Sequence, residues 1–355
     1  MLRLRLKAKD GGGGLAGVID TERGGALTVE PSSRAVGVEV RAKFDDPDVT
    51  QTGERRASGA LERLETVWFN TGTLCNITCQ NCYIESSPSN DRLAYIAAAE
   101  VTSLLDELLR DGYDTREIGF TGGEPFMNPE FIAMLGATLE RGFDVLVLTN
   151  AMQPMQRTPI KRGLIALKER HGARLRLRVS LDHFTPELHE AERGQRSWSK
   201  AIAGLDWLND NGFEIAIAGR TCWDEPEGEE RNGYAALITS RGWRIDPFNP
   251  KQLMLLPEMD GSHDVPEITT RCWTILDKRP QDLMCATSRM VVKRKGAARP
   301  VVLPCTLLPY EPAFEMGVTF AEAGAKDGGM FANGAVKLCH PHCAKFCVLG
   351  GGSCS

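Results

Sequence analysis

The stretch FDVLVLTN, residues 143–150, decides the fold class, because it is a continuous apolar run bounded by turn residues. Such a run is typical of a parallel strand that is covered on both faces. Strand-like runs recur on either side of it, at residues 66–72, 116–123, 174–182, 213–220 and 251–258. Strands that alternate with helices form right-handed βαβ units and a parallel sheet. We therefore predict an α/β fold whose sheet is open or curled into a partial barrel.

Helical patterns lie between these runs. An apolar stripe along residues 101–108 predicts a helix that ends at Gly112. Residues 128–142 predict another helix, with Asn128 at its N-cap and Gly142 after its last turn. Further helical stretches are expected at about 160–171, 198–210 and 231–241.

Composition excludes several functional classes. The chain has 355 residues, a net charge of -5, 42% hydrophobic and 25% charged residues. This balance does not favour nucleic acid as a partner, and no stretch is apolar and long enough to span a membrane or to serve as a signal peptide. We therefore expect a cytoplasmic protein, in which the 11 cysteines are metal ligands or redox groups rather than a disulfide framework.

The texture of the sequence divides the chain into three parts. Residues 1–64 are poorly patterned and rich in glycine, and we interpret them as a partly disordered extension. Residues 65–258 carry the alternating strands and helices. From residue 259 to 355 the alternation fades, and seven cysteines gather in a region with many prolines and glycines. This last part is predicted to be a small domain organised around something other than a large core.

The motif CNITCQNC places Cys75, Cys79 and Cys82 directly after the first strand. Thiolates suit zinc and iron–sulfur clusters, and three of them leave one position of either centre open. The motif TGGEP, residues 121–125, ends the next strand. Because loops at the carboxyl ends of parallel strands share one face, the two motifs are expected to converge there. Glycines allow close backbone approach to a ligand, and Glu124 is able to accept a hydrogen bond from an ammonium group.

Together the two motifs resemble the radical S-adenosylmethionine (radical SAM) superfamily, over roughly residues 67–258. The resemblance implies a partial (β/α)6 TIM-like barrel in which the three cysteines hold a [4Fe-4S] cluster and SAM binds the fourth iron. It also implies that Gly122, Gly123, Glu124 and Pro125 receive the methionine amino group. Reductive cleavage of SAM would then give a 5′-deoxyadenosyl radical that abstracts hydrogen from a substrate, with the cofactors supplying the hard chemistry.

Further matches to this family are looser. Asn150 and Ser180 end the third and fourth predicted strands and would reach the ribose or methionine part of SAM, while Arg193 would pair with its carboxylate. Each of these residues is equally consistent with a strand-end cap or a surface ion pair. Asn81 stands where the family often has an aromatic residue or histidine near the adenine, which leaves adenine stacking open. We expect Asn81→Ala to weaken SAM binding more than iron content.

Two residues are candidates for a catalytic role. His183 follows the fourth strand and could transfer a proton, although exposed loop histidines are commoner. Cys222 follows the fifth strand and could donate a hydrogen atom, although a lone cysteine is more often an inert small side chain.

The fourth strand alternates leucine and valine with arginine and serine, a period of two. Helices should cover the apolar row, so the polar row is expected to face the barrel lumen. There Arg176 and Arg178 would suit an anionic group. The alternative, favoured for Arg176, is pairing with a carboxylate such as Glu117 near the closed end of the barrel.

Seven cysteines follow residue 259, and we consider them candidate ligands of one or two auxiliary iron–sulfur clusters: Cys272, Cys285, Cys305, Cys339, Cys343, Cys347 and Cys354. Residues 284–306 predict a β-hairpin with a cysteine near each end. This layout is similar to the SPASM and twitch extensions of radical SAM enzymes, although the spacing differs from the SPASM pattern. A zinc site that includes His340 and His342 is the alternative.

The resemblance implies a radical SAM enzyme, and peptide or protein modification is the first hypothesis for its reaction. A small-molecule substrate and a non-catalytic metal-binding module or electron carrier are the alternatives. An electron donor such as flavodoxin or ferredoxin is the implied partner. The sequence does not identify the substrate, the bond that changes or the fate of SAM.

Overall fold

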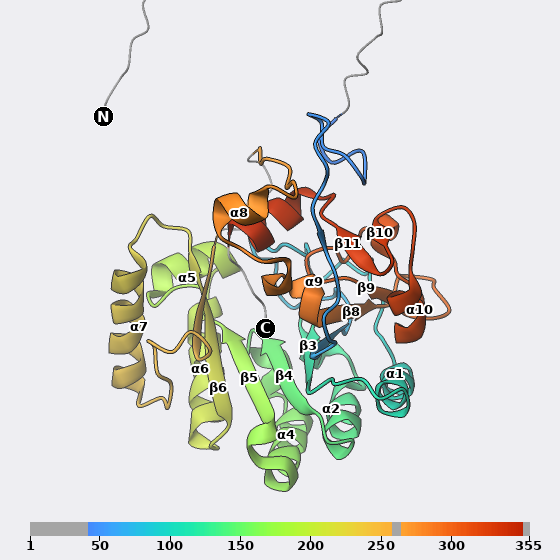
Figure 1. The fold of residues 1–355 in the computed structure, drawn as a ribbon. Coiled ribbons are helices and arrows are strands. Elements are labelled where there is room, and N and C mark those ends of the chain that lie inside the picture. The colour runs from blue at the N-terminus through green and yellow to red at the C-terminus, as the bar shows by residue number, and fades with distance from the viewer. Residues whose placement is uncertain (1–41, 258–263, 351–355) are drawn as a thin grey trace, which may run out of the picture. The chain divides into compact units, whose positions relative to one another are not determined.

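The computed structural model describes residues 42–257 and 264–350 of the chain. Its main sheet has eight strands in the order β7-β6-β5-β4-β3-β2-β8-β9 (Figure 1). The six strands predicted from the sequence are present as β2 (Thr66–Asn70), β3 (Glu117–Thr121), β4 (Asp144–Thr149), β5 (Leu175–Ser180), β6 (Glu214–Thr221) and β7 (Leu253–Pro257). Every neighbouring pair among them is parallel. The predicted α/β class is confirmed, and the sheet is open at β7 and β9 in the described part of the chain.

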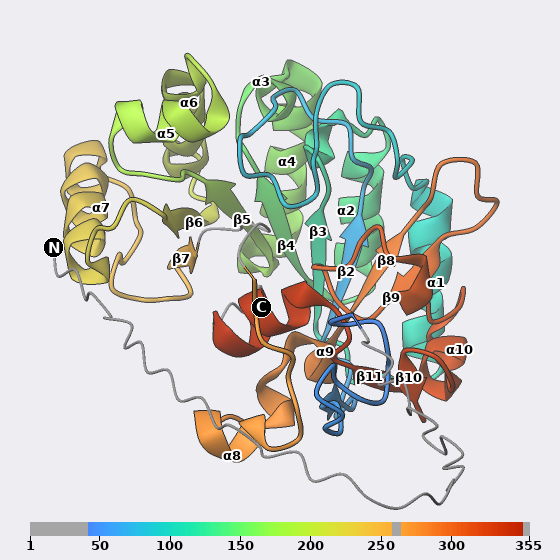
Figure 2. The same cartoon turned by 90° about the horizontal axis from the view of Figure 1, so that it is seen from above.

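Helices cover one side of this sheet (Figure 2). They are α1 (Ala98–Arg110), α2 (Phe131–Glu140), α3 (Gln153–Gln156), α4 (Thr158–His171), α5 (Pro186–Arg193), α6 (Ser197–Asp210) and α7 (Glu227–Arg241). The predicted stripe of α1 is buried, at Val101, Leu104, Leu105 and Leu108. Single-turn 3-10 segments lie at Pro125–Met127, Gly172–Arg174, Pro280–Asp282 and Pro312–Phe314.

Asn128 is not the N-cap of α2, which corrects the prediction from the sequence. The chain first forms a 3-10 turn at Pro125–Met127, and α2 begins only at Phe131. Asn128 instead donates from its amide to the carbonyl oxygens of Thr71 and Ile96, at 3.1 and 3.0 Å. It therefore fastens both ends of the cysteine-bearing loop between β2 and α1.

The predicted C-terminal hairpin is present and extends the main sheet. Its strands β8 (Ser288–Val292) and β9 (Val301–Leu303) are antiparallel to each other, and β8 pairs in parallel with β2. Four of the C-terminal cysteines, Cys285, Cys305, Cys339 and Cys343, lie in the same hydrophobic core as the sheet. These cysteines therefore share an apolar core with the sheet, and Cys285 and Cys305 flank the hairpin that pairs with β2. The expectation of a separate small domain organised around something other than a large core stays a prediction. The domain boundary near residue 258 stays a prediction.

The remaining elements belong to the two ends of the described chain. They are the small sheet β1 (Ser58–Gly59), β11 (Ala335–Lys337) and β10 (Phe331–Ala332), and the helices α8 (Cys272–Leu276), α9 (Met284–Thr287), α10 (Phe320–Ala325) and a π-helix at Cys343–Leu349. Of these, α9 packs against β8 and α10 against β9. The π-helix lies on the concave side of the main sheet, opposite α2 and α4 (Figure 2). Because β1 pairs with β11, residues 42–64 join the C-terminal region. The disorder expected for residues 1–41 lies outside the described residues.

Candidate active site and a second cysteine cavity

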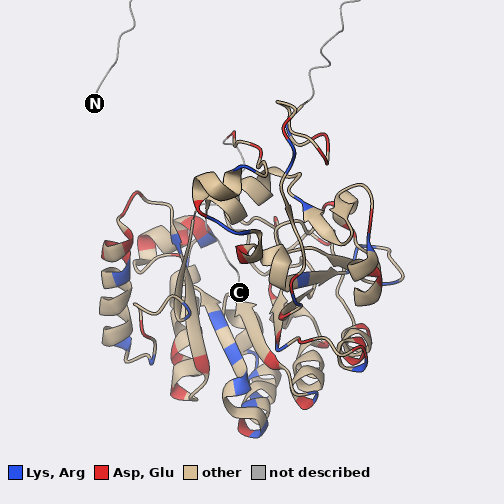
Figure 3. Ribbon diagram, in the orientation of Figure 1, with Lys and Arg blue, Asp and Glu red and all other residues tan. Residues whose placement is uncertain are grey.

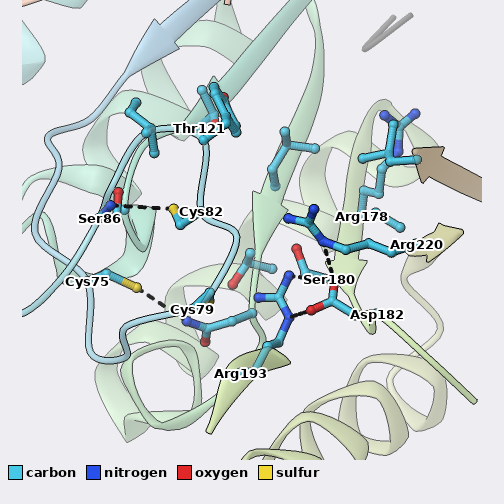
Figure 4. Close-up of a pocket in the computed structure, with 18 of the residues that line it drawn as sticks. Cys75, Cys79, Cys82, Ser86, Thr121, Arg178, Ser180, Asp182, Arg193 and Arg220 are labelled. Carbon is cyan, nitrogen blue, oxygen red and sulfur yellow. Dashed lines mark hydrogen bonds and ion pairs between the residues drawn. The ribbon is translucent and has the colours of Figure 1, made fainter. Parts of the chain in front are cut away.

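A cavity opens at the carboxyl ends of the parallel strands, where the sequence placed the site (Figure 4). All three thiols of the CNITCQNC motif line it. On its other walls lie the predicted residues Gly122, Gly123, Asn150, Ser180 and Arg193. The structure therefore brings together these eight candidates, which come from five separate segments of the chain.

Cys75 is the most enclosed of the three thiols, with 6% of its surface exposed. Burial raises the pKa of Cys75 to about 12 and also raises that of Cys79. Deprotonation by a bound metal is the ordinary way in which a thiol of this kind becomes a ligand. The loop itself is held by hydrogen bonds from the Cys75 amide to Ser87 and from the Ser86 amide to the Cys82 sulfur.

The two glycines of TGGEP face the backbone of the cysteine loop. A Cβ atom on Gly123 would lie 2.1 Å from the Leu74 carbonyl oxygen, and one on Gly122 would lie 2.6 Å from the Gly72 carbonyl oxygen. Gly122 also has a φ of 154°. No larger residue fits at either position without moving the loop, so the glycines fix the distance between the thiols and the end of β3.

Glu124 and Pro125 do not line the cavity. The Glu124 carboxylate is buried and accepts hydrogen bonds from the Thr149 hydroxyl and the Asn150 amide, both at 2.8 Å. Burial raises the pKa of Glu124 to about 7. In this arrangement Glu124 fastens the end of β4 to the TGGEP turn, and its predicted contact with SAM stays a prediction.

Asn150 connects the end of β4 to the first thiol. Its side-chain amide donates to Asn76 at 2.9 Å and approaches the Cys75 sulfur at 3.9 Å. The side-chain oxygen Oδ1 of Asn150 accepts a hydrogen bond from the Met152 backbone amide at 3.0 Å. Asn150 is therefore in position to orient Cys75 and to present polar atoms to a ligand in the cavity.

Arg193 forms a two-point ion pair with Asp182, at 2.6 and 2.9 Å (Figure 4). Arg220 approaches the same carboxylate at 3.5 Å. Although burial alone would raise it, the pKa of Asp182 is held below its usual value by these two guanidinium groups. Asp182 and Arg220 both line the cavity and were missed as site residues. Their position at strand ends, in VSLD and AGR, is the signal that could have identified them.

Glu192 ties α5 to the cysteine loop and was also missed. Its carboxylate accepts from the backbone and the side-chain amide of Asn81, each at 3.0 Å. The Arg220 guanidinium donates to the Asn81 carbonyl oxygen at 3.1 Å. Asn81 does not line the cavity, so its polar side chain is explained by this network. No sequence pattern pointed to Glu192, because the partner lies 111 positions away.

The two arginines of β5 have separate environments. Arg178 and Ser180 line the cavity, as the alternation predicted, and the Arg178 guanidinium lies 3.6 Å from the Met254 sulfur. Arg176 pairs with Glu117 at the other end of the strand, as expected. Figure 3 shows the basic residues along β5.

Neither catalytic candidate lines the cavity. His183 is 1% exposed, and its ring contacts the Thr185 hydroxyl at 2.9 Å and Glu225 at 3.3 Å. Cys222 is partly buried and carries no disulfide. Their catalytic roles stay predictions.

A second, smaller cavity lies beside the first and is lined by four thiols: Cys285, Cys305, Cys343 and Cys347. Its other walls are apolar. Burial raises the pKa of Cys285 to about 12 and the pKa of Cys343 well above its usual value, and the neighbouring thiols add to the second shift. Met284 and Leu307 line both cavities, so one layer of side chains separates them.

The other C-terminal candidates lie elsewhere. Cys339 contacts the carbonyl oxygen of Phe44 at 3.0 Å, and Cys272 accepts from the Thr269 amide at 3.3 Å. His342 contacts the Leu307 carbonyl oxygen at 3.0 Å, and the His342 amide donates to His340. Cys354 is outside the described residues.

No three His, Cys, Asp or Glu side chains in residues 42–257 and 264–350 lie close enough to bind a single metal ion. A zinc ion needs four ligands within about 2.3 Å of one point. Seven of the thiols instead line the two cavities, three in the first and four in the second. The zinc alternative with His340 and His342 stays a prediction. In the same residues, every helix is too short or too polar to cross a bilayer.

Comparison with known proteins agrees with this geometry. Residues 69–224 match the model of the radical SAM superfamily. The chain is 25% identical over 267 residues to the antilisterial bacteriocin subtilosin biosynthesis protein AlbA of Bacillus subtilis, covering 70% of this chain and 56% of AlbA. It is 31% identical over 219 residues to the GTP 3′,8-cyclase of Caulobacter vibrioides, covering 57% of this chain and 58% of that enzyme. The chain thus spans somewhat over half the length of these curated relatives.

Solved structures share the fold. SuiB of Streptococcus suis bound to S-adenosylmethionine superposes with a TM-score of 0.52 at 12% identity, covering 72% of this chain and 63% of SuiB. Native anSMEcpe with bound AdoMet gives a TM-score of 0.52 at 14% identity, covering 72% of this chain and 79% of that protein.

Proposed function

Because the chain belongs to the radical SAM superfamily, we propose that Cys75, Cys79 and Cys82 hold the [4Fe-4S] cluster of this class and that SAM binds in the adjoining cavity. The observation that carries the proposal is the convergence of all three thiols with the TGG turn and the ends of β4 and β5 on one cavity. Three thiols leave one iron for SAM. When bound, the cluster supplies the electron that cleaves SAM to methionine and a 5′-deoxyadenosyl radical.

The protein's own part in this chemistry is to bind, orient and shield. The glycines and Asn128 fix the cysteine loop against β3, and Asn150 orients Cys75. Ser180, Arg178 and Arg220 present polar groups along the wall where SAM and the substrate would lie. Arg193 is occupied by Asp182, so a SAM carboxylate would share that guanidinium or use Arg220.

The second cavity supports an auxiliary iron–sulfur cluster with Cys285, Cys305, Cys343 and Cys347 as its ligands. Four thiols that surround one apolar cavity match the ligand set of a fully protein-bound [4Fe-4S] cluster. Cys272 and Cys339 lie outside this cavity, which favours one cluster in the described residues. Met284 and Leu307 line both cavities, so the two cavities are close neighbours. An electron could therefore pass between the auxiliary cluster and a substrate in the first cavity.

For the substrate we favour a peptide or protein, processed in the cytoplasm with electrons from a flavodoxin or ferredoxin. The likeness to AlbA, a bacteriocin biosynthesis protein, supports this choice. The likeness to GTP 3′,8-cyclases favours a small molecule as the second candidate. A gene for a short precursor peptide beside this gene would favour the first.

Anaerobic reconstitution with iron and sulfide tests the proposal, with dithionite as reductant and SAM as substrate. We expect 5′-deoxyadenosine to form in the wild-type protein and in Cys222→Ala, which serves as the matched thiol control. Cys75→Ala, Cys79→Ala and Cys82→Ala should each abolish it. Formation of 5′-deoxyadenosine without these thiols, or its absence from iron-loaded wild type, would contradict the proposal.

A further inference from the structure

Arg289 is a buried cation beside the second cavity. It lies in β8, is 2% exposed, and is among the largest fully buried side chains of the described residues. Its Nη1 atom donates to the carbonyl oxygens of Cys285 and Ser288, at 2.6 and 2.7 Å. Its Nη2 atom is buried and has no hydrogen-bond partner within residues 42–257 and 264–350.

No carboxylate forms an ion pair with Arg289 in the described part of the chain, whereas the nearby Arg294 pairs with Glu315. A guanidinium stays protonated in proteins, and an uncompensated buried charge costs several kcal/mol. Burial lowers the pKa of Arg289, and the thiols of Cys285 and Cys305 act in the opposite direction. The buried positive charge of Arg289 therefore needs a negative group nearby, and no carboxylate of the described residues provides one.

Of the four thiols of the second cavity, those of Cys285 and Cys305 act electrostatically on Arg289. Cys285 lies in α9, the short helix that directly precedes β8, and its carbonyl oxygen accepts a hydrogen bond from the guanidinium. Cys305 lies just after the partner strand β9. Iron binds cysteine as the thiolate, so a loaded site carries negative charge that the empty site lacks.

We propose that Arg289 is the buried counter-charge of the auxiliary iron–sulfur cluster and that it raises the reduction potential of that cluster. This inference rests on the proposed function of the second cavity. A fixed positive charge favours the more negative, reduced state of a cluster, and the surrounding charge is one of the factors that set cluster potentials. Arg289 acts through the cluster and is not a catalytic residue.

The test measures the midpoint potential of the auxiliary cluster by electron paramagnetic resonance during a redox titration. The full-length chain with Cys75, Cys79 and Cys82 changed to alanine is used, so that the auxiliary cluster gives the only cluster signal. We expect Arg289→Met to lower the midpoint potential by at least about 59 mV, which corresponds to a tenfold change in the one-electron equilibrium constant. Arg289→Lys keeps the charge and should remain within half of that shift.

Arg294→Met is the matched control. It removes an arginine from the same hairpin, five positions further along and beyond the end of β8, where Glu315 balances its charge. The midpoint potential of the auxiliary cluster in Arg294→Met should equal that in the triple-alanine protein with both arginines intact. An equal shift in Arg294→Met, or no shift in a cluster-loaded Arg289→Met, overturns the inference.

Thermal unfolding of the metal-free protein gives a second measurement that does not need the cluster. Without thiolates to balance it, the buried charge is a liability, so Arg289→Met should unfold at a temperature equal to or above that of wild type. A lower unfolding temperature for both Arg289→Met and Arg289→Lys would show a packing role and overturn the inference. If wild type binds no auxiliary cluster at all, the proposed function of the second cavity fails first, and this inference fails with it.

Discussion

The two cysteine cavities differ in how the chain holds their thiols. In the first, three thiols come from one loop, and polar contacts from α5, β4 and β6 hold that loop in place. In the second, four thiols come from three segments, α9, the end of the hairpin and the π-helix, that meet inside an apolar core. Under the proposed function, the first site would leave a position open and admit polar ligands, whereas the second would enclose its cluster.

The largest expected effect separates the two cavities by their products. Cys79→Ala should lose all formation of 5′-deoxyadenosine, because the first cluster is incomplete. Cys343→Ala should still form 5′-deoxyadenosine but lose about half of the bound iron, since only the enclosed cluster is lost. Liquid chromatography of the nucleoside and an iron assay check both variants. Equal loss of 5′-deoxyadenosine in the two would contradict a division of roles.

The next prediction breaks the polar support of the first cavity. Arg193→Met leaves Asp182 buried with only the longer contact to Arg220, and removing one partner of a buried ion pair costs about 3 kcal/mol. Chemical denaturation should show this loss. The double variant Arg193→Met with Asp182→Asn should recover part of it, because no charge is then left unpaired. An additive double variant would show that the two side chains do not interact.

The polar support of the first cavity can also be tested by varying the pH. His189 belongs to it and accepts a hydrogen bond from the Asp182 amide at 3.3 Å. Burial lowers the pKa of His189 from 6.5 to about 4, and Arg193 and His183 act in the same direction while Asp182 and Glu190 oppose them. As the pH falls, His189 is therefore protonated in the unfolded chain before it is protonated in the folded chain. The free energy of unfolding should fall by about 3 kcal/mol between pH 6.5 and pH 4.

Denaturation of wild type and of His189→Gln over this pH range measures the effect. Wild type should lose stability on acidification more steeply than the variant, so the gap between them narrows. Parallel curves would show that His189 is protonated alike in the folded and unfolded chain.

The smallest effect is expected at Asn81. Asn81→Ala removes the side-chain hydrogen bond to Glu192 and leaves the backbone contact in place. Removing a contact that orients a ligand-bearing loop typically costs about tenfold in affinity or activity. SAM binding, measured by calorimetry, should weaken while iron content stays unchanged. Iron loss equal to the loss of SAM binding would mean that Asn81 supports the thiols instead.

The sequence predicted the strands well because a buried parallel strand is a continuous apolar run, as in residues 143–150, and because residues 174–182 alternate with a period of two. It also predicted the convergence of the cysteine loop with the TGG turn, since strand direction alone dictates it. It failed at Asn128, where a long-range bond to Thr71 outweighed the local capping signal. Glu192 was beyond its reach, because its partner Asn81 lies 111 positions away. Arg289 was missed because the sequence does not reveal that its guanidinium is buried without a carboxylate partner among the described residues.

The pairing of β8 with β2 has a practical consequence for anyone who wishes to shorten the protein. All five residues of β2 are buried, and β8 covers the hydrogen-bonding edge of that strand. A fragment that stopped near residue 258 would expose this edge as a template for pairing with other chains. Such a fragment should therefore accumulate in inclusion bodies, even though it contains every residue of the CNITCQNC and TGGEP motifs.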